Sequence, residues 1–474
     1  MSAWLLLGAF VAIASITVAG VYSGRKVKDA SDFSGGSGRA GATIVMGTII
    51  GTLVGGSSTV GTAQLAYTYG MSAWWFTLGA GIACLLLALA FTKPLRQMGA
   101  GTLTTMIGAE YGKRAQMAAS ILNSVGTFIN VIAQLLSGTA IIEILFPRLN
   151  TVASAGLVAL LMLFYVVFGG VWGTGLVGIV KTLLLYLAVI ASGVVALILS
   201  GGVRTLWTSL PHETYFNLFA RGVGKDGGAG VSLILGVLST QTYAQAILAG
   251  RSDREAKRGA LLSACMIPPI GIGGILVGMY MRLQATPEML ADGRLLSTAA
   301  KTAFPKFILD QLPPFFSGLI LATLLIAVLG TGAGLSLGIS TIIHRDIVSS
   351  LTTKFTDPKR GLLFSRSCIA VVLALAVAFT ALPASFILDF SFLSMGLRAA
   401  VVFAPLLGAL FCKGKIQPGY ALLAIVAGPL FVLFGKLVGT RFDPLFLGMA
   451  AALLIMAVGL ARGRKRGRML YKDA

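Results

Sequence analysis

Apolar segments of about twenty residues follow one another along almost the whole chain, and this feature restricts the possible folds most strongly. A helix of about twenty apolar residues spans the hydrocarbon core of a bilayer. The composition agrees, because 56% of the 474 residues are hydrophobic and only 11% are charged. We therefore expect one all-α, multi-pass membrane protein with about thirteen transmembrane helices. The segments are residues 2–23, 42–68, 72–95, 116–145, 151–170, 175–200, 229–249, 259–281, 315–343, 361–382, 386–411, 417–436 and 442–461.

The positions of the basic residues predict the orientation. If the N-terminus lies outside, most of the 37 Lys and Arg residues fall in loops on one side of the membrane. By the positive-inside rule, this side is cytoplasmic and includes the C-terminus. Topology thus explains the net charge of +21, and no nucleic-acid partner is needed. The basic residues Arg25, Lys26 and Lys28 follow the first segment, the reverse of a signal peptide, so we expect it to remain as a helix in the inner or plasma membrane.

The second apolar segment contains a run, Gly47–Gly61, that weakens a helix. Glycine leaves the backbone unrestrained, and short hydroxyl side chains compete for backbone hydrogen bonds. A broken helix at membrane depth is tolerated where its freed backbone groups are buried in protein or line a wet cavity, so the break is a candidate binding site. Close helix packing through small residues four positions apart is the alternative. The run has glycines at 47, 51, 55 and 56, followed by Ser57, Ser58 and Thr59.

A second interruption occurs in the seventh segment, where Gly236 is followed by the polar run Ser-Thr-Gln-Thr at 239–242. It lies about five helices after the first, as expected of two fused five-helix repeats of opposite orientation. Paired interruptions at matching positions indicate a transport site near the membrane midplane. We expect the breaks near Gly55 and Thr240 to form that site.

The fourth segment carries a polar face. Its polar residues recur at spacings that place them on one side of a helix, and such a face would not point toward lipid. It faces either a wet cavity or polar partners on other helices, and both possibilities remain open. The residues are Asn123, Thr127, Asn130, Gln134 and Ser137.

Two basic residues lie inside apolar segments instead of in loops. Lys181 is about two turns into the sixth segment, and Arg398 is near the middle of the eleventh. An ionised side chain near the bilayer centre costs at least about 2.5 kcal/mol, so each indicates a functional role. Alternatively, Lys181 extends to the cytoplasmic edge. A structural pair between Arg398 and Asp389 would have to span nine residues of one helix, which is too far for direct contact.

The sequence shows no arrangement of residues typical of catalysis. The two histidines, His212 and His344, are predicted in loops on opposite sides of the membrane. The four cysteines have no spacing typical of a metal site or of a disulfide. We expect no enzyme activity, no metal and no cofactor other than a coupling ion. The cysteines are Cys84, Cys265, Cys368 and Cys412.

Several motifs in a fixed order resemble the sodium:solute symporter family, which carries sugars, proline, sialic acid, pantothenate and choline. The loop QTYAQAILAGRSDREAKRGALLSA, from Gln241 to Ala264, resembles a family signature, although Ala246 replaces its usual Arg. LPPFFSGLILATLLIAVLGTGAG resembles the helix with the sodium site, and HRDI at 344–347 its cytoplasmic end. Two further stretches are most similar to the choline-carrier branch of the family: GTLVGGSSTVGTAQLAYTYGMSAWW and the following AFTKPLRQMGAGTLTTM.

The resemblance implies a LeuT-type fold, with ten core helices in two inverted repeats. We expect a single transport domain, 1–474, which the resemblance divides into five parts. These are a leading helix at 2–23, a first repeat at 42–200, a second repeat at 229–411, two trailing helices at 417–461 and a basic cytoplasmic tail at 462–474. The resemblance also implies a cation site with backbone carbonyls at Gly51 and Val54 in the first core helix. The partner helix would add a carbonyl at Ala327 and hydroxyls at positions 330 and 331.

The sequence departs from the family at this cation site. Gly330 has no hydroxyl, whereas Thr331 keeps one. In the fifth core helix, Gly178 replaces the family's Asp and Lys181 its Gln. The site is therefore expected to be degraded for sodium, with the Lys181 ammonium as a protonatable cation that bonds the carbonyls of Gly51, Val54 and Ala327.

The expected function is secondary active transport of a small polar solute by alternating access. Arg398 offers a fixed fork of donors suited to a carboxylate. Choline is disfavoured, because the positions of the choline-binding tryptophans align with Leu53, Asn130 and Thr240. The coupling ion is H⁺ or Na⁺, or coupling is absent, and we expect the protein to function as a monomer. The neutral residues predicted around the solute are Ser57, Ser58, Asn130, Gln134, Thr240 and Gln241.

Three alternatives remain open. The first is a conventional Na⁺-coupled solute symporter, in which the remaining oxygens still bind sodium. The second is a membrane sensor built on a symporter-like domain, which the lack of room for a kinase before Ala474 disfavours. The third is a passive channel.

Overall fold

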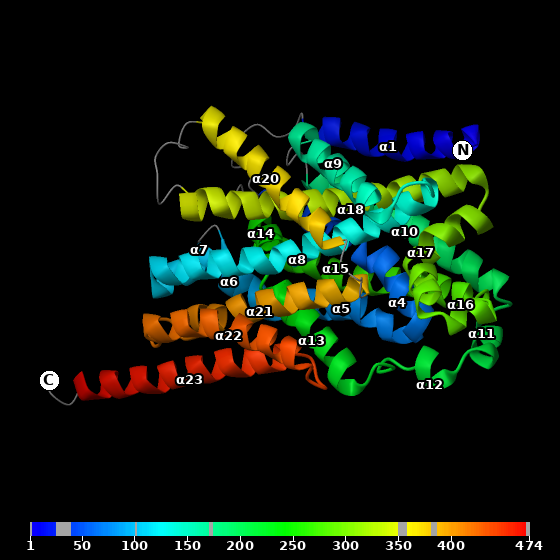
Figure 1. Ribbon diagram of the computed structural model, residues 1–474. Helices are drawn as coiled ribbons and strands as arrows, with labels where there is room; N and C mark the ends of the chain where they lie inside the picture. The colour runs from blue at the N-terminus through cyan, green and yellow to red at the C-terminus, as the bar shows by residue number, and fades with distance from the viewer. Residues whose placement is uncertain are drawn as a thin grey trace.

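The computed structural model describes residues 2–24, 39–99, 102–169, 174–348, 358–380 and 386–470, and these are almost entirely helical. The predicted all-α fold is confirmed, and every predicted apolar segment falls on one helix or on helices separated by a break. The elements, labelled as in Figure 1, are α1 (Ala3–Gly24), α3 (Ala42–Leu53), η1 (Ser57–Gly61), α4 (Thr62–Tyr69), η2 (Gly70–Trp74), α5 (Trp75–Leu86), η3 (Leu87–Phe91), α6 (Thr92–Met98), α7 (Leu103–Tyr111), α8 (Lys113–Leu145), α9 (Thr151–Gly169), α10 (Thr174–Leu199), α11 (Val203–Ser209), α12 (His212–Tyr215), α13 (Val223–Leu238), α14 (Gln241–Ala249), α15 (Asp253–Leu283), α16 (Pro287–Ala291), α17 (Gly293–Gln311), α18 (Pro314–Ile342), η4 (Ile343–Val348), α20 (Pro358–Thr380), α21 (Ile387–Phe411), α22 (Pro418–Val438) and α23 (Leu445–Leu470).

The described helices include nine that are long and apolar enough to cross a membrane, or ten if the bent pair α13–α14 counts as one span. Shorter apolar stretches lie at Ala3–Val18, Ala42–Leu53 and Thr151–Tyr165. The count of thirteen spans and the sidedness of the termini stay predictions. Arg25, Lys26 and Lys28 lie outside the described residues, and the predicted tail begins as a helix, because α23 continues to Leu470.

The long helices lie side by side in one bundle (Figure 1). α8 packs against α18 and α21 at the centre, whereas α1 covers α18 and α10 at one edge and α22–α23 covers α21 at the other. The short helices α11, α12 and α16 gather with the longer α17 at one end, which we call the outer end. α6 and α7 lie at the opposite end, which we call the basic end (Figure 1). By the positive-inside rule we expect the basic end to be cytoplasmic.

The predicted break in the second segment is confirmed. α3 ends at Leu53, Val54 is extended with ψ 104°, and the chain resumes as the π-helical turn η1 and then α4. The freed N–H of Gly55 donates to Ser58 Oγ at 3.0 Å, and that of Gly56 donates to Gln134 Oε1 at 2.9 Å. Both groups are thus satisfied inside the protein, as a break at membrane depth requires.

The glycines of this break also permit close packing, as the alternative interpretation of the run expected. A Cβ at Gly55 would lie 2.8 Å from Gln134 Oε1 and from Thr331 Oγ1. A Cβ at Gly51 would lie 2.8 Å from the Cα of Gly178 on α10. Larger residues would separate α3 from α10, and the break from α8 and α18.

The second predicted break is also confirmed. α13 ends at Leu238, α14 begins at Gln241, and the two axes differ by 47°. A Cβ on Gly236 would lie 2.5 Å from Met395 Cβ, so this glycine brings the break close to α21. Both breaks therefore lie against the buried centre of the bundle.

Candidate functional site

The ammonium of Lys181 lies between α3, α10 and α18. Its Nζ donates to the carbonyl oxygen of Gly51 at 2.7 Å, to that of Ala327 at 3.1 Å and to Thr331 Oγ1 at 3.1 Å. The residue is 5% exposed. The alternative in which this side chain extends to the membrane edge is therefore wrong.

Local backbone structure explains this position. α3 ends two residues after Gly51, so the Gly51 carbonyl is among the last of the helix. Carbonyls there lack partners within the helix, and the C-terminus is the negative end of the helix dipole. Gly178 lies one turn before Lys181, and a Cβ there would overlap the Gly47 carbonyl oxygen. The missing side chain at 178 thus lets α10 approach α3 closely enough for the lysine to reach the break.

One contact of the predicted cation site differs in the structure. The third hydrogen bond of Lys181 goes to Thr331 Oγ1, whereas the sequence analysis expected the Val54 carbonyl. Val54 lies in the break itself, and its N–H donates to Ile50 O at 2.8 Å. At Gly330, an added Cβ would lie 3.4 Å from Tyr165 Oη on α9.

A second group links the first break to α8 and α21. Gln134, which accepts from the Gly56 N–H, donates through Nε2 to Ser57 Oγ at 3.1 Å. Ser57 Oγ lies 2.6 Å from Ser391 Oγ, and Ser391 Oγ donates to Asn130 Oδ1 at 3.4 Å. The structure thus brings together Ser57, Asn130 and Gln134, as predicted for one site.

Ser391 is a member of this group that the sequence analysis missed. It lies two turns before Arg398, so the two residues are on one face of α21. That spacing was the available signal. Ser58, in contrast, turns back into the break, where its Oγ donates to Gly55 O at 3.0 Å and accepts from the Gly55 N–H.

Arg398 lies about 10 Å further along α21 toward the basic end, by the helical rise over seven residues. Its NH1 donates to Thr240 Oγ1 at 3.0 Å, its Nε to Ser394 O at 3.2 Å, and its NH2 contacts Met395 Sδ at 3.0 Å. The residue is 1% exposed. All three partners are neutral, and within the described ranges no ion pair includes Arg398.

Two buried polar atoms near Arg398 lack hydrogen-bond partners among the described residues: Asn123 Oδ1 and Ser239 Oγ. Asn123 lies one turn before Gly126 on α8, and a Cβ at Gly126 would be 2.9 Å from Arg398 Cγ. Ser239 directly precedes Thr240, the partner of Arg398 NH1. Buried polar atoms are normally satisfied, so these two are candidates for contact with a ligand.

Gln241 does not join either group through its carbonyl oxygen. Its Oε1 accepts from the N–H of Leu103 at 2.6 Å, at the first residue of α7. The structure thus places this oxygen at the basic end of the bundle. The prediction that Gln241 supplies a hydrogen bond at the solute site is not supported by this contact.

In this conformation the groups around the two breaks are enclosed. Ser57 is 1% exposed, Gln134 2% and Thr240 5%. No set of three or more His, Cys, Asp or Glu residues that could hold a metal occurs in the part of the chain that the structure describes. The enclosed chemistry consists of two cations, several hydroxyls and amides, and backbone groups at two helix breaks.

A family model described as the sodium:solute symporter family matches residues 33–428. The uncharacterized symporter YwcA of Bacillus subtilis is 32% identical over 189 residues, which cover 39% of this chain and 36% of that relative. The sodium/sialic acid symporter SiaT of Proteus mirabilis is 22% identical over 94% of this chain and 92% of its own. The high-affinity choline transporter 1 of Torpedo marmorata is 25% identical over 84% and 71%.

Solved structures give the same fold. A Na⁺-coupled sialic acid symporter in a substrate-bound outward-open state has a TM-score of 0.76 at 18% identity, over 98% of both chains. The inward-facing form of Mhp1 has a TM-score of 0.56 at 11% identity, over 91% of this chain and 92% of its own. Both are transporters of the LeuT type, which confirms the predicted fold class.

Proposed function

Because the chain belongs to the sodium:solute symporter family, we propose that it is a secondary transporter that carries a small, carboxylate-bearing solute by alternating access. The family consists of transporters, in agreement with the prediction that the chain is not an enzyme. Helix breaks at the midplane supply a solute with backbone and side-chain partners in this fold. The solute site lies between η1, α8, the α13–α14 break and α21.

The single observation that carries the choice of solute is the buried guanidinium of Arg398, whose partners among the described residues are all neutral. A charge buried without a counter-ion is costly, and a bound carboxylate would compensate it. A guanidinium matches a carboxylate with two parallel N–H···O bonds. The relative with a sialic acid substrate also carries an acid, which supports this chemistry.

Neutral groups would orient the rest of the solute. Thr240 bonds the guanidinium, and the unpartnered atoms belong to its chain neighbour Ser239 and to Asn123, one turn from the Gly126 that faces Arg398. The group of Ser57, Asn130 and Gln134 meets α21 at Ser391, two turns before Arg398. This separation of about 10 Å suits a solute with its carboxylate at one end and hydroxyl or amide groups at the other.

For the coupling ion, we propose that Lys181 occupies the cation position and exchanges a proton in place of sodium. Its ammonium already bonds two carbonyls and a hydroxyl that a sodium ion would need. The opposing candidate is a conventional Na⁺-coupled symporter. It is favoured by the sodium-coupled sialic acid relative and by the oxygens of Gly51, Ala327 and Thr331, which remain in place.

A screen of matched ligands tests the solute proposal. Amino, hydroxy and oxo acids are each compared with their own amides in thermal unfolding of the purified protein, together with neutral sugars and nucleobases. Acids should raise the unfolding temperature while their amides do not. Stabilisation by neutral compounds, with every acid inactive, would rule the proposal out.

Transport of the compound found in that screen separates the remaining classes. A carrier shows saturable uptake and counterflow in proteoliposomes, a channel shows neither, and a sensor binds the compound without moving it. The proposal requires counterflow.

A further inference from the structure

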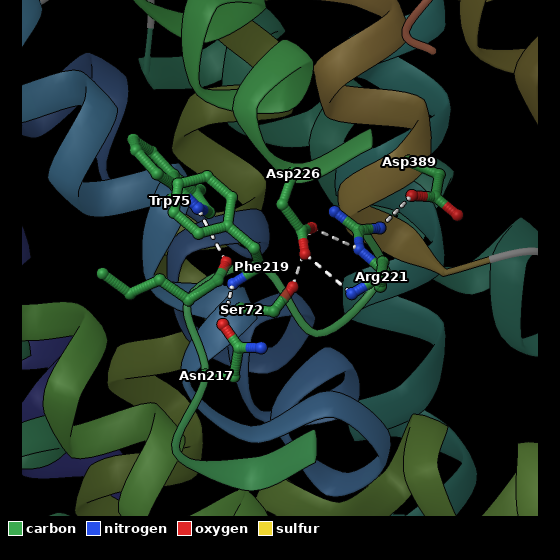
Figure 2. Close-up of polar contacts among 8 residues, drawn as sticks. Ser72, Trp75, Asn217, Phe219, Arg221, Asp226 and Asp389 are labelled. Carbon is green, nitrogen blue, oxygen red and sulfur yellow. Dashed lines mark hydrogen bonds and ion pairs between the residues drawn. The ribbon is translucent and has the colours of Figure 1, made fainter. Parts of the chain in front are cut away.

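A separate group of charged residues lies at the outer end of the bundle (Figure 2). Arg221 is in the loop between α12 and α13, and its guanidinium faces two carboxylates from different helices. Its Nε lies 2.7 Å from Asp226 Oδ1, and its NH1 lies 2.9 Å from Asp389 Oδ1. Asp226 is in the first turn of α13 and Asp389 in the first turn of α21. The arginine therefore joins the outer ends of α13 and α21.

The contact with Asp226 is a fixed one. The Asp226 side chain is fully buried, its Oδ2 accepts from the Arg221 backbone N–H at 2.9 Å, and its Oδ1 also accepts from Ser72 Oγ at 2.8 Å. Breaking a buried pair of this kind leaves an uncompensated charge. The loop is further anchored where Trp75 Nε1 donates to Leu218 O at 2.8 Å (Figure 2). Arg221 thus moves with α13, η2 and α5.

The contact with Asp389 is of a different kind. The Asp389 side chain is 38% exposed, and a single hydrogen bond from NH1 connects it to Arg221. Partly exposed ion pairs are weak and exchange readily with water. The same arginine therefore has one permanent carboxylate partner and one that it can release.

This releasable contact lies directly over the central site. Ser391, which contacts Ser57, is two residues after Asp389 on α21. The Arg221 guanidinium carbon lies over the Phe392 ring, 6.0 Å from the ring centroid. Phe392 also packs edge-on against Phe76 of α5, with the two ring centroids 5.8 Å apart. The first turn of α21 thus lies between the solute group and the outer end.

We propose that the Arg221–Asp389 ion pair is a latch that closes the outer end of α21 over the central site and opens when solute enters. The proposal rests on the alternating-access function proposed above. The pair with Asp226 holds the arginine in position in both states, and only the pair with Asp389 forms and breaks. Loss of Asp389 therefore favours the outward-open state without altering the solute contacts.

The test measures access to the site without any solute. Ser391→Cys serves as the reporter, in the full-length chain with its four native cysteines replaced by alanine, and a membrane-impermeant thiol reagent is applied in turn from each side. Because position 391 is buried when the latch is closed, the reaction rate reports the open population. Asp389→Asn should raise the rate from the outer side by about 1.5- to 5-fold, the effect expected from one partly exposed pair. Glu213→Gln, which removes an exposed neighbouring carboxylate on α12, is the matched control and should not change it.

Two further results decide the outcome. Asp389→Glu keeps the charge and should restore slow modification. If Asp389→Asn does not fold, the rate in the reporter chain should still rise with ionic strength, because salt screens the partly exposed pair. An unchanged or slower rate in Asp389→Asn, or in high salt, would overturn the latch. A failed solute proposal would appear separately, as absent acid binding or counterflow with the accessibility change intact.

Discussion

The two buried cations differ in what surrounds them, and this difference assigns them different roles. Lys181 has three neutral oxygen partners from α3 and α18, one for each N–H of its ammonium. Arg398 has a hydroxyl, one carbonyl and a sulfur atom as partners for its five N–H donors, and none of the described residues pairs it with an anion. Lys181 therefore suits the position of a bound cation, and Arg398 suits recognition of a charged solute.

Arg398→Gln should abolish the preference for acids over their amides. Loss of hydrogen bonds to a charged group costs about 1.5–3 kcal/mol, which corresponds to about a 10- to 150-fold weaker Kd for the acid. Arg398→Lys keeps the charge but loses the planar fork, so its Kd should be intermediate. Equilibrium binding measures both variants, with Arg441→Gln, an exposed arginine, as the control. An unchanged acid preference in Arg398→Gln would contradict the assigned role.

At the scale of the helices, the glycines decide how closely α10 approaches α3. Gly178→Ala places a Cβ into the Gly47 carbonyl oxygen, a backbone atom that cannot rotate away. We expect it to lower the free energy of unfolding by about 1–3 kcal/mol and to weaken the Lys181 contacts. Gly156→Ala on α9, where nothing lies within 4 Å of the added Cβ, should be neutral or slightly stabilising. Thermal unfolding compares the two, and equal effects would contradict this view of the interface.

Gln241 makes a different prediction, because its carbonyl oxygen binds the first N–H of α7. Gln241→Ala should accelerate hydrogen exchange in Leu103–Tyr111 and leave the solute Kd within about two-fold. Gln241→Glu keeps an acceptor oxygen and should preserve the protection of α7. A large loss of solute affinity in Gln241→Ala, with hydrogen exchange in α7 unchanged, would indicate that Gln241 contacts the solute.

The helix breaks and the depth of the charged residues could be predicted from sequence, because glycine runs, hydroxyl clusters and apolar segments are local patterns. The inward direction of Lys181 followed from the family's cation site. The partners of Asp389 and of Gln241 could not be predicted in this way, since Arg221 and Leu103 are distant in the chain and meet them only through tertiary packing. Ser391 was missed because isolated serines in an apolar helix are common.

At the scale of the whole molecule, both breaks and both buried cations lie between helices of the central bundle. The Lys181 contacts join α10 to α3 and α18, and those of Arg398 join α21 to the second break. The latch at the outer end connects α13 to α21. Movement of these helices past one another would therefore change the contacts of the solute, the internal cation and the outer end together.

The central claim is that the lysine ammonium replaces sodium, and one measurement tests it most directly. Uptake of the acid found in the ligand screen is followed in proteoliposomes under a sodium gradient alone and under a proton gradient alone, for the wild type and for Lys181→Gln. The account predicts uptake that the proton gradient drives, or that is indifferent to sodium, and that Lys181→Gln abolishes. Uptake that requires sodium and persists without the lysine would contradict it.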